Sequence, residues 1–240
     1  MDALTRHAAH PTTLCCRPQP RPDWGGRTRP LKSPALWSFI VHSLSTRTRW
    51  LEQVRESGLN RSEIFITTKI YCAGNASGAV AAIESDLQQL GLPQVDLVLI
   101  HRPTAYPGHP EQCQNAAQRA ATWQGLEQAL KAGKTRAIGV SNFNDTELGA
   151  LLETAKVPPA VNQCQLSVGS HDDATIDFCR AHGITYEAYS PLRGNEMSQQ
   201  AVKKIAATHG KSGAQVILRW IVQQGHILAT SADNTEYLLR

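Results

Sequence analysis

Two strand-like apolar segments of this chain each end on an ionisable side chain. Residues 64–69 read Ile-Phe-Ile-Thr-Thr-Lys and end on Lys69, and residues 95–101 read Val-Asp-Leu-Val-Leu-Ile-His and end on His101. A buried parallel strand is apolar along its length, and α/β enzymes place their chemistry at the carboxyl ends of such strands. Because lysine and histidine can both take part in general acid–base catalysis, the pattern indicates an enzyme whose site lies at the strand ends.

The same residues also have purely structural interpretations. Taken alone, Lys69 could form an ion pair at the rim of a sheet, and His101 could be a hydrogen-bonded histidine at a strand end. Tyr189 alone is more often a core residue than a stacking platform, and Gln163 alone indicates little. The catalytic interpretation therefore depends on whether other strand ends converge on the same place.

The elements that would position these side chains alternate between strands and helices. From about residue 48 the sequence predicts six strand-then-helix units, which is typical of parallel strands joined by right-handed crossovers. Polar residues recur at the predicted strand ends: Lys69, His101, Ser141, Asn142, Gln163, Tyr189 and Ser231. Convergence of many strand ends on one rim favours a (β/α)8 barrel of the TIM type. An open dinucleotide-binding sheet would carry a G-x-G-x-x-G motif, which the chain lacks.

Length and composition set the broad class. The chain has 240 residues and a mean hydropathy of -0.31, which predicts one large α/β domain. No apolar run has the length of a membrane span and the first residues lack a secretion signal, so we expect a cytoplasmic protein without a membrane partner. Import into an organelle is the open alternative, because residues 1–50 carry eight Lys/Arg against two Asp/Glu. Those arginines form no helical stripe, so no nucleic-acid partner is expected.

The start of the chain differs from the remainder. Residues 1–47 are rich in proline and arginine, which predicts an irregular segment in front of a barrel domain at residues 48–240. The six cysteines form no C-x-x-C pair, and no Cys/His cluster has zinc spacing. We therefore expect no metal site and free thiols in a reducing compartment. These cysteines are Cys15, Cys16, Cys72, Cys113, Cys164 and Cys179.

Five segments come in the order seen in the aldo-keto reductase family. They are residues 65–69 (FITTK), 96–103 (DLVLIHRP), 133–143 (GKTRAIGVSNF), 161–163 (VNQ) and 188–192 (AYSPL). The chain therefore resembles that family from about residue 48 to residue 240. The resemblance implies a (β/α)8 barrel that binds NADPH at the strand carboxyl ends without a Rossmann motif. It also implies reduction of aldehydes or ketones to alcohols.

The resemblance gives each matching residue a role. Lys69 would lower the pKa of a proton-donating tyrosine, and His101 would orient and polarise the substrate carbonyl. The carboxamide of the nicotinamide would be hydrogen-bonded by Ser141, Asn142 and Gln163, and its ring would stack on Tyr189. The pyrophosphate and adenosine side would be lined by Ser190, Leu192 and Ser231.

The chain departs from the family pattern before Lys69. The family's catalytic aspartate and tyrosine belong to an Asp-Thr-Ala-x-x-Tyr segment there, but the first tyrosine in this chain is Tyr71. Residues 1–47 match no family motif, and the chain ends within the family's final helix. We therefore expect a barrel truncated at both ends, with about six of the eight family strands. Residues 35–43 are apolar enough to supply a seventh strand, and no segment is expected to fill the eighth position.

The predicted function is reduction of a small carbonyl compound with NADPH. Many family members hold the 2′-phosphate of NADPH with a lysine and an arginine where this chain has Thr230 and Glu236, so NADH is an open alternative. The competing prediction is a catalytically impaired cofactor-binding or interaction protein derived from the family, and a weaker one is a redox-sensing subunit. The loop at residues 102–120 would line the substrate pocket. The sequence names neither the substrate nor the oligomeric state.

Overall fold

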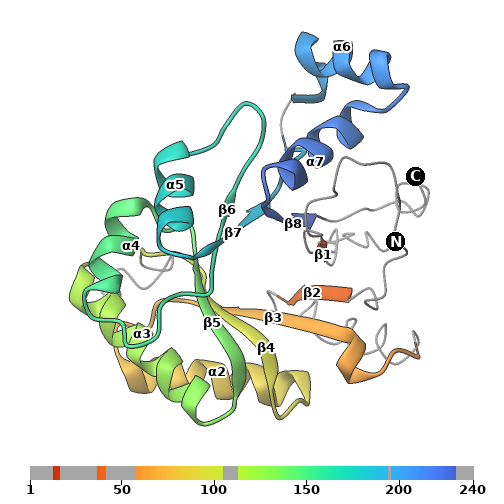
Figure 1. The fold of residues 1–240 in the computed structure, drawn as a ribbon. Helices are drawn as coiled ribbons and strands as arrows, with labels where there is room; N and C mark the ends of the chain where they lie inside the picture. The colour runs from red at the N-terminus through yellow and green to blue at the C-terminus, as the bar shows by residue number, and fades with distance from the viewer. Residues whose placement is uncertain (1–12, 17–36, 42–57, 105–112, 194–195, 231–240) are drawn as a thin grey trace, which may run out of the picture.

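Strands β1 to β8 follow one another in chain order around a closed barrel (Figure 1). The structure is a computed structural model that describes residues 13–16, 37–41, 58–104, 113–193 and 196–230. The strands are β1 Thr13–Cys16, β2 Trp37–Val41, β3 Ile64–Ile70, β4 Val95–Ile100, β5 Thr135–Ser141, β6 Val161–Gln165, β7 Thr185–Tyr189 and β8 Ile227–Thr230. The helices are α2 Ala76–Leu90, α3 Ala116–Lys131, α4 Asp145–Leu152, α5 Asp173–Ala181, α6 Gln200–His209 and α7 Gly213–Gln223, with short 3-10 turns η1 Arg61–Glu63 and η2 Glu196–Ser198.

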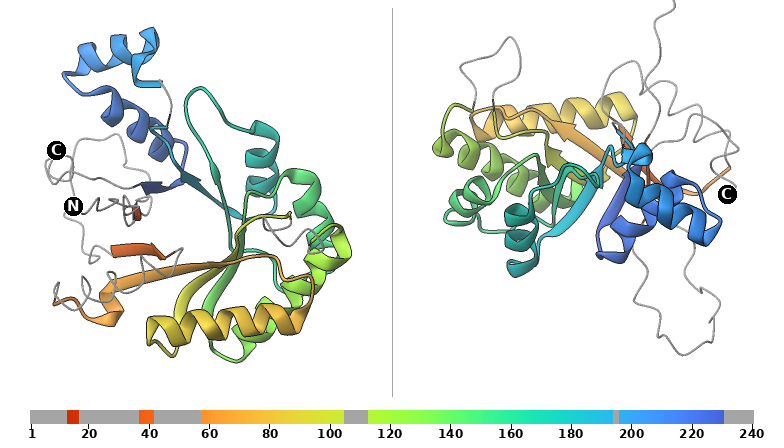
Figure 2. Two further views of the ribbon diagram at one scale, coloured as in Figure 1. Left: turned by 180° about the vertical axis from the view of Figure 1, so that it is seen from behind. Right: turned by 90° about the horizontal axis from the view of Figure 1, so that it is seen from above.

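The strands from β2 to β8 pair in parallel, each with the next. Helices α2 to α5 lie outside strands β3 to β7 (Figures 1 and 2), so they cover the outer face of these strands. Every residue of β4 is buried, as expected for a central parallel strand. The predicted (β/α)8-type barrel is confirmed: in the described residues the six strands β3 to β8 are parallel, and helices follow β3 to β7.

The helix boundaries follow local capping chemistry. Helix α2 begins where the Asn75 side chain accepts a hydrogen bond from the amide of Gly78 at 2.7 Å, and it ends at Gly91, which has a φ of 63°. Helix α3 begins the same way, because Asn115 accepts from the amide of Gln118. Asparagine caps and a left-handed glycine satisfy the backbone groups that a helix end leaves open.

The first two strand positions of the barrel are filled by short strands. Residues 37–41 supply β2, which confirms the seventh strand expected from residues 35–43. The expectation that no segment fills the eighth position is wrong, because β1 pairs with both β2 and β8. Strand β1 is antiparallel to both neighbours, whereas a full (β/α)8 ring is parallel throughout. All eight strands are hydrogen-bonded into a closed barrel, but only β2 to β8 are parallel, so the parallel barrel of the (β/α)8 fold is incomplete.

The amino-terminal end of the parallel strands carries a buried carboxylate with a structural role. Asp96 in β4 is 1% exposed and binds Arg61 at 2.7 Å and Arg136 at 2.8 Å. It also accepts a hydrogen bond from the amide of Ile66 at 2.8 Å. These contacts join β3, β4 and β5 at the end of the barrel opposite to Lys69, which separates this charge cluster from the candidate site.

Three sequence expectations fall partly or wholly outside the described residues. Ser231 and Glu236 lie in 231–240, and residues 105–112 of the loop predicted at residues 102–120 also lie outside the described part. Of residues 1–47, the structure describes only β1 and β2. No helix in the described ranges combines the length and apolar composition needed to cross a membrane.

Candidate active site

Lys69 lies in the interior of the barrel near the carboxyl end of β3. Its side chain is 8% exposed, and its Nζ is 3.4 Å from the Ser141 Oγ at the end of β5. The same Nζ lies over the ring of Tyr189 at the end of β7, 5.6 Å from the ring centroid. The ends of three strands that are distant in sequence therefore converge on one ammonium group, as the strand-end pattern predicts.

Burial changes the protonation chemistry of this lysine. Removal from water lowers the pKa of Lys69 from 10.5 to about 8. The negative charge of Glu187 opposes that fall in the pKa, while the nearby guanidinium of Arg102 adds to it. Lys69 can thus exchange a proton near neutral pH, which an exposed lysine cannot do.

Asn142 connects three strand ends of the rim by hydrogen bonds. Its Nδ2 donates to the backbone oxygen of His101 at 2.9 Å and to Ser141 Oγ at 3.1 Å, and its Oδ1 accepts from the Tyr189 hydroxyl at 2.7 Å. The residue adopts a left-handed φ of 62°, which asparagine tolerates better than most side chains. This backbone conformation places the Asn142 side-chain amide beside the ends of β4, β5 and β7, where it forms the three hydrogen bonds.

Gln163 in β6 offers a buried acceptor atom. The side chain is 1% exposed, and its Nε2 donates to Glu187 Oε2 at 3.0 Å. Within the described ranges its Oε1 makes no hydrogen bond. An unsatisfied buried carbonyl oxygen is costly, typically by about 1–3 kcal/mol, and a bound donor would relieve that cost. A carboxamide N–H₂ group, such as that of a nicotinamide, fits this requirement.

His101 follows β4 directly and is partly buried. Its backbone amide donates to the Ile70 oxygen at 2.8 Å, which holds the residue beside the end of β3. Its ring centroid lies 5.3 Å from that of Tyr71, an exposed residue that follows the same strand. His101 and Lys69 thus come from neighbouring strand ends.

The residues predicted for the pyrophosphate side do not belong to the polar network around Lys69 in the described part of the chain. Ser190 has a left-handed φ of 51°, and its backbone oxygen accepts from the amide of Arg193 at 3.2 Å. Leu192 packs against the hydrophobic core. In the described part of the chain neither residue makes a polar contact with the network around Lys69, and Ser231 lies outside that part.

Glu187 is a site residue that sequence reasoning missed. It lies in β7, is 4% exposed, and is in register with Gln163 of β6. Strand alternation could have found it, because residues i and i+2 share a face and Glu187 precedes Tyr189 by two positions. A carboxylate that faces the interior from a buried strand is costly to desolvate, so we expect it to have a hydrogen-bonding or charged partner or a functional role.

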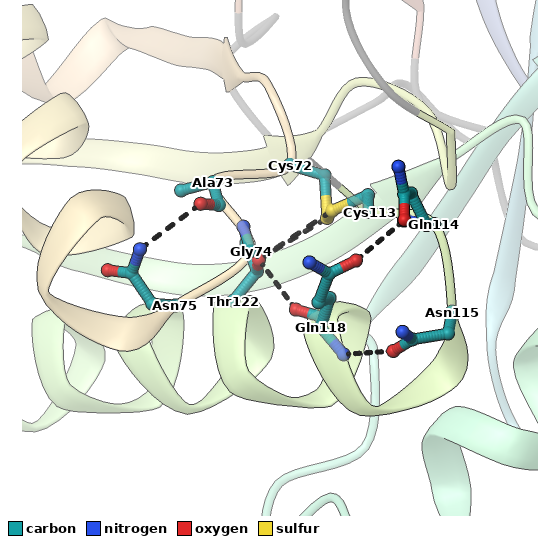
Figure 3. Close-up of a disulfide and its surroundings, with 9 residues drawn as sticks. All are labelled: Cys72, Ala73, Gly74, Asn75, Cys113, Gln114, Asn115, Gln118 and Thr122. Carbon is teal, nitrogen blue, oxygen red and sulfur yellow. Dashed lines mark hydrogen bonds between the residues drawn. A yellow bond between two sulfur atoms is a disulfide. The ribbon is translucent and has the colours of Figure 1, made fainter. Parts of the chain in front are cut away.

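The turn after β3 carries a disulfide (Figure 3). Cys72 is joined to Cys113, which precedes α3, across 41 residues of sequence with a Cα–Cα distance of 5.9 Å. Thr122 Oγ1 in α3 lies 3.3 Å from the Cys72 sulfur and accepts from the Gly74 amide at 3.0 Å. The expectation of free thiols is therefore wrong for this pair, because the fold brings together two cysteines that look unrelated in sequence.

Two other cysteines do behave as the sequence predicts. Cys164 and Cys179 are free and buried. Burial raises the pKa of the Cys164 thiol to about 12, which keeps it protonated and unreactive at neutral pH.

Comparisons with known proteins agree with this arrangement. The sequence model of the "Aldo/keto reductase family" matches residues 41–239. Glyoxal reductase of Bacillus subtilis is 40% identical over 174 residues, covering 72% of this chain and 59% of the relative. An NADPH-dependent codeinone reductase of Papaver somniferum is 36% identical over 190 residues, covering 73% of this chain and 59% of the relative. The chain thus spans about three fifths of the length of these curated relatives.

Solved structures show the same likeness. An aldo/keto reductase from Brucella melitensis superimposes with a TM-score of 0.75 at 28% identity, covering 84% of this chain and 75% of that one. A Bombyx mori aldo-keto reductase in complex with NADP superimposes with a TM-score of 0.74 at 26% identity, covering 84% and 70%.

Proposed function

Because this chain belongs to the aldo-keto reductase family, we propose that it binds NADPH at the carboxyl ends of its barrel strands and reduces a small aldehyde or ketone to the alcohol. The family match over residues 41–239 supports the reaction class. The names of the relatives, a glyoxal reductase and an NADPH-dependent codeinone reductase among them, support the cofactor and the carbonyl substrate.

The observation that carries the proposal is the buried Oε1 of Gln163. It lies at the strand ends within a polar network that includes Ser141 and Asn142, and it makes no hydrogen bond within the described residues. A nicotinamide carboxamide would donate to it, and the ring of Tyr189, held by its hydroxyl bond to Asn142, would support the nicotinamide. NADPH, when bound, supplies a hydride to the carbonyl carbon.

The chain's own residues would then act on the carbonyl oxygen. His101 would donate a hydrogen bond that orients and polarises this oxygen, and the Lys69 ammonium would stabilise the negative charge that develops on it. The tyrosine that donates the proton in the family has no counterpart before Lys69, because the first tyrosine of the chain is Tyr71. The proton that completes the alcohol must then come from solvent water. Loss of a general acid typically slows a reaction by about 10²–10⁴-fold, so this absence favours slow turnover.

That absence also supports the second candidate function, cofactor binding without significant reduction. Both functions require NADPH to bind, so the first experiment measures binding through quenching of the protein's tryptophan fluorescence. We expect Gln163→Leu to weaken NADPH binding by about tenfold, the equivalent of one lost hydrogen bond. The matched control is Gln89→Leu, because Gln89 is exposed on α2. Equal binding by the Gln163→Leu protein and wild type would contradict the assigned site.

The second experiment measures oxidation of NADPH in the presence of glyoxal, a small reactive dicarbonyl compound. Turnover that is lost in the Lys69→Met protein supports the reductase. Binding without turnover supports the second candidate, and turnover that survives Lys69→Met would refute the role of Lys69. Absence of both binding and turnover in wild type would refute the proposed function.

Cofactor choice belongs to the same proposal. We expect NADPH to bind more tightly than NADH, in keeping with the relatives, although Thr230 at the end of β8 cannot hold a phosphate as a lysine would. Dissociation constants for the two cofactors, measured by the same fluorescence titration, decide this preference. Equal constants would show that the chain has lost 2′-phosphate recognition.

A further inference from the structure

Glu187 is a buried carboxylate that the proposed reaction does not itself use. It is 4% exposed within the barrel, and strand alternation places it on the same face of β7 as Tyr189. Burial of an ionised carboxylate costs several kcal/mol unless hydrogen bonds and opposite charge compensate. The buried carboxylate of Glu187 is therefore expected to have compensating partners in the barrel interior.

One compensating contact sets the orientation of Gln163. The two residues face each other in the parallel register of β6 and β7, and Gln163 Nε2 donates to Glu187 Oε2 at 3.0 Å. A carboxylate can only accept hydrogen bonds, so it selects the amide rotamer in which the nitrogen faces Glu187. The opposite end of the amide, Oε1, is thereby left as an acceptor for a ligand.

The second compensating group is Lys69, which is also charged and is 8% exposed in the barrel interior. The charged or titratable groups that act on it are Glu187 from β7, Cys164 from β6 and Arg102 after β4. Of these, Glu187 is the carboxylate, and Cys164 stays protonated because burial raises the pKa of its thiol. Lys69 Nζ lies 5.6 Å from the ring centroid of Tyr189, and Glu187 shares that face of β7, so this carboxylate lies on the side of the barrel interior that faces the ammonium group.

We propose that Glu187 is a positioning residue that holds the Gln163 amide with its carbonyl oxygen toward the cofactor and provides the buried counter-charge of Lys69. The inference rests on the proposed function for its cofactor part. It extends that function because it assigns the donor–acceptor polarity of the site: the ligand group that meets Gln163 must be a hydrogen-bond donor. A carboxamide N–H₂ satisfies this rule, and a carboxylate in the same position does not.

The test compares Glu187→Gln with a matched control, Asp86→Asn. Glu187→Gln removes the charge but keeps the shape, and the new amide lets Gln163 turn either way. Asp86 is also a buried carboxylate, 7% exposed, but it lies on α2 and accepts a hydrogen bond from Thr68. We expect Glu187→Gln to weaken NADPH binding by about 5–100-fold, while Asp86→Asn binds as wild type does.

A second measurement follows Lys69 without any cofactor. Competitive acetylation at a series of pH values, with the Lys69 peptide quantified by mass spectrometry, gives the titration midpoint of its amine. We expect the midpoint to fall in Glu187→Gln and to stay at the wild-type value in Asp86→Asn. Glu187→Asp should preserve the charge effect on Lys69 but recover NADPH binding only in part, because its shorter side chain reaches Gln163 poorly.

These outcomes separate the two proposals. If wild type fails to bind NADPH, the proposed function fails, and the Lys69 midpoint still decides whether Glu187 is its counter-charge. If wild type binds and Glu187→Gln matches it in both affinity and midpoint, the positioning role is refuted. If Glu187→Gln does not fold, the NADPH affinity of Glu187→Asp decides the positioning role, because an affinity equal to that of wild type would refute it.

Discussion

The contact between helices α2 and α3 gives a stability prediction that follows directly from the geometry. Gly125 lies in α3, where a Cβ atom built on it would meet the Ala76 backbone oxygen at 2.5 Å and the Ala79 Cβ at 2.6 Å. Both distances are below any normal contact, and neither partner atom can move away by rotating a side chain. The Gly125→Ala variant must therefore separate the two helices locally.

The expected size follows from two opposing effects. Overpacking of a tight interface costs about 1–3 kcal/mol, and the rigid backbone partner favours the upper end of this range. Alanine gains about 1 kcal/mol over glycine in intrinsic helix propensity. We therefore expect Gly125→Ala to lower the free energy of unfolding by about 2 kcal/mol.

Gly149 in α4 is the matched control, because its Cβ would meet nothing closer than the Phe178 ring at 3.9 Å. This is an ordinary van der Waals contact, so Gly149→Ala should keep the propensity gain and stabilise the protein by up to about 1 kcal/mol. Urea unfolding followed by circular dichroism measures both variants. The packing argument is refuted if Gly125→Ala is as stable as wild type or shifts in the same direction as Gly149→Ala.

Two further predictions concern the disulfide and the site lysine. Because the Cys72–Cys113 bond closes a loop of 41 residues, its loss should lower the free energy of unfolding by about 4 kcal/mol in the chain-entropy treatment. Urea unfolding of the Cys72→Ser/Cys113→Ser double variant measures this loss, with reduced wild type for comparison. Equal stability of oxidised and reduced wild type would contradict the prediction. For Lys69, the pKa is about 8 in the folded state against 10.5 in the unfolded state, so the unfolded state binds more protons between these pH values. The free energy of unfolding of wild type should therefore rise by up to about 3 kcal/mol relative to that of Lys69→Met between pH 8 and pH 10.5. A difference in stability between the two proteins that does not change with pH would refute the lowered pKa.

Much of the fold follows from local sequence signals. The apolar strands and the helices that alternate with them are periodic patterns, which the chain carries within each element. The position of Lys69 at the end of β3 and of Gln163 within β6 follows from the same patterns. The aldo-keto reductase motifs lie on these strand ends, which is why the sequence alone identifies them.

The features that sequence reasoning missed depend on contacts between distant segments. Strand β1 closes the barrel by pairing with β8, more than two hundred residues away, and its four residues carry no pattern that distinguishes them from an irregular segment. The Cys72–Cys113 pair likewise has no spacing rule, since it depends on how the turn after β3 meets the start of α3. Such pairings become visible only when the chain is folded.

The sequence by itself determined the family, the order of the strands, and the residue types that the rim presents, with Lys69 and His101 among them. Those properties follow from short motifs and from the period of the apolar residues, which are local features of the sequence. Tertiary structure alone decided that Glu187 faces Gln163 and that the Oε1 of this glutamine makes no hydrogen bond within the described residues. The physical reason is that the orientation of a buried amide and the pKa of a buried amine are set by neighbours on other strands, which no local pattern specifies.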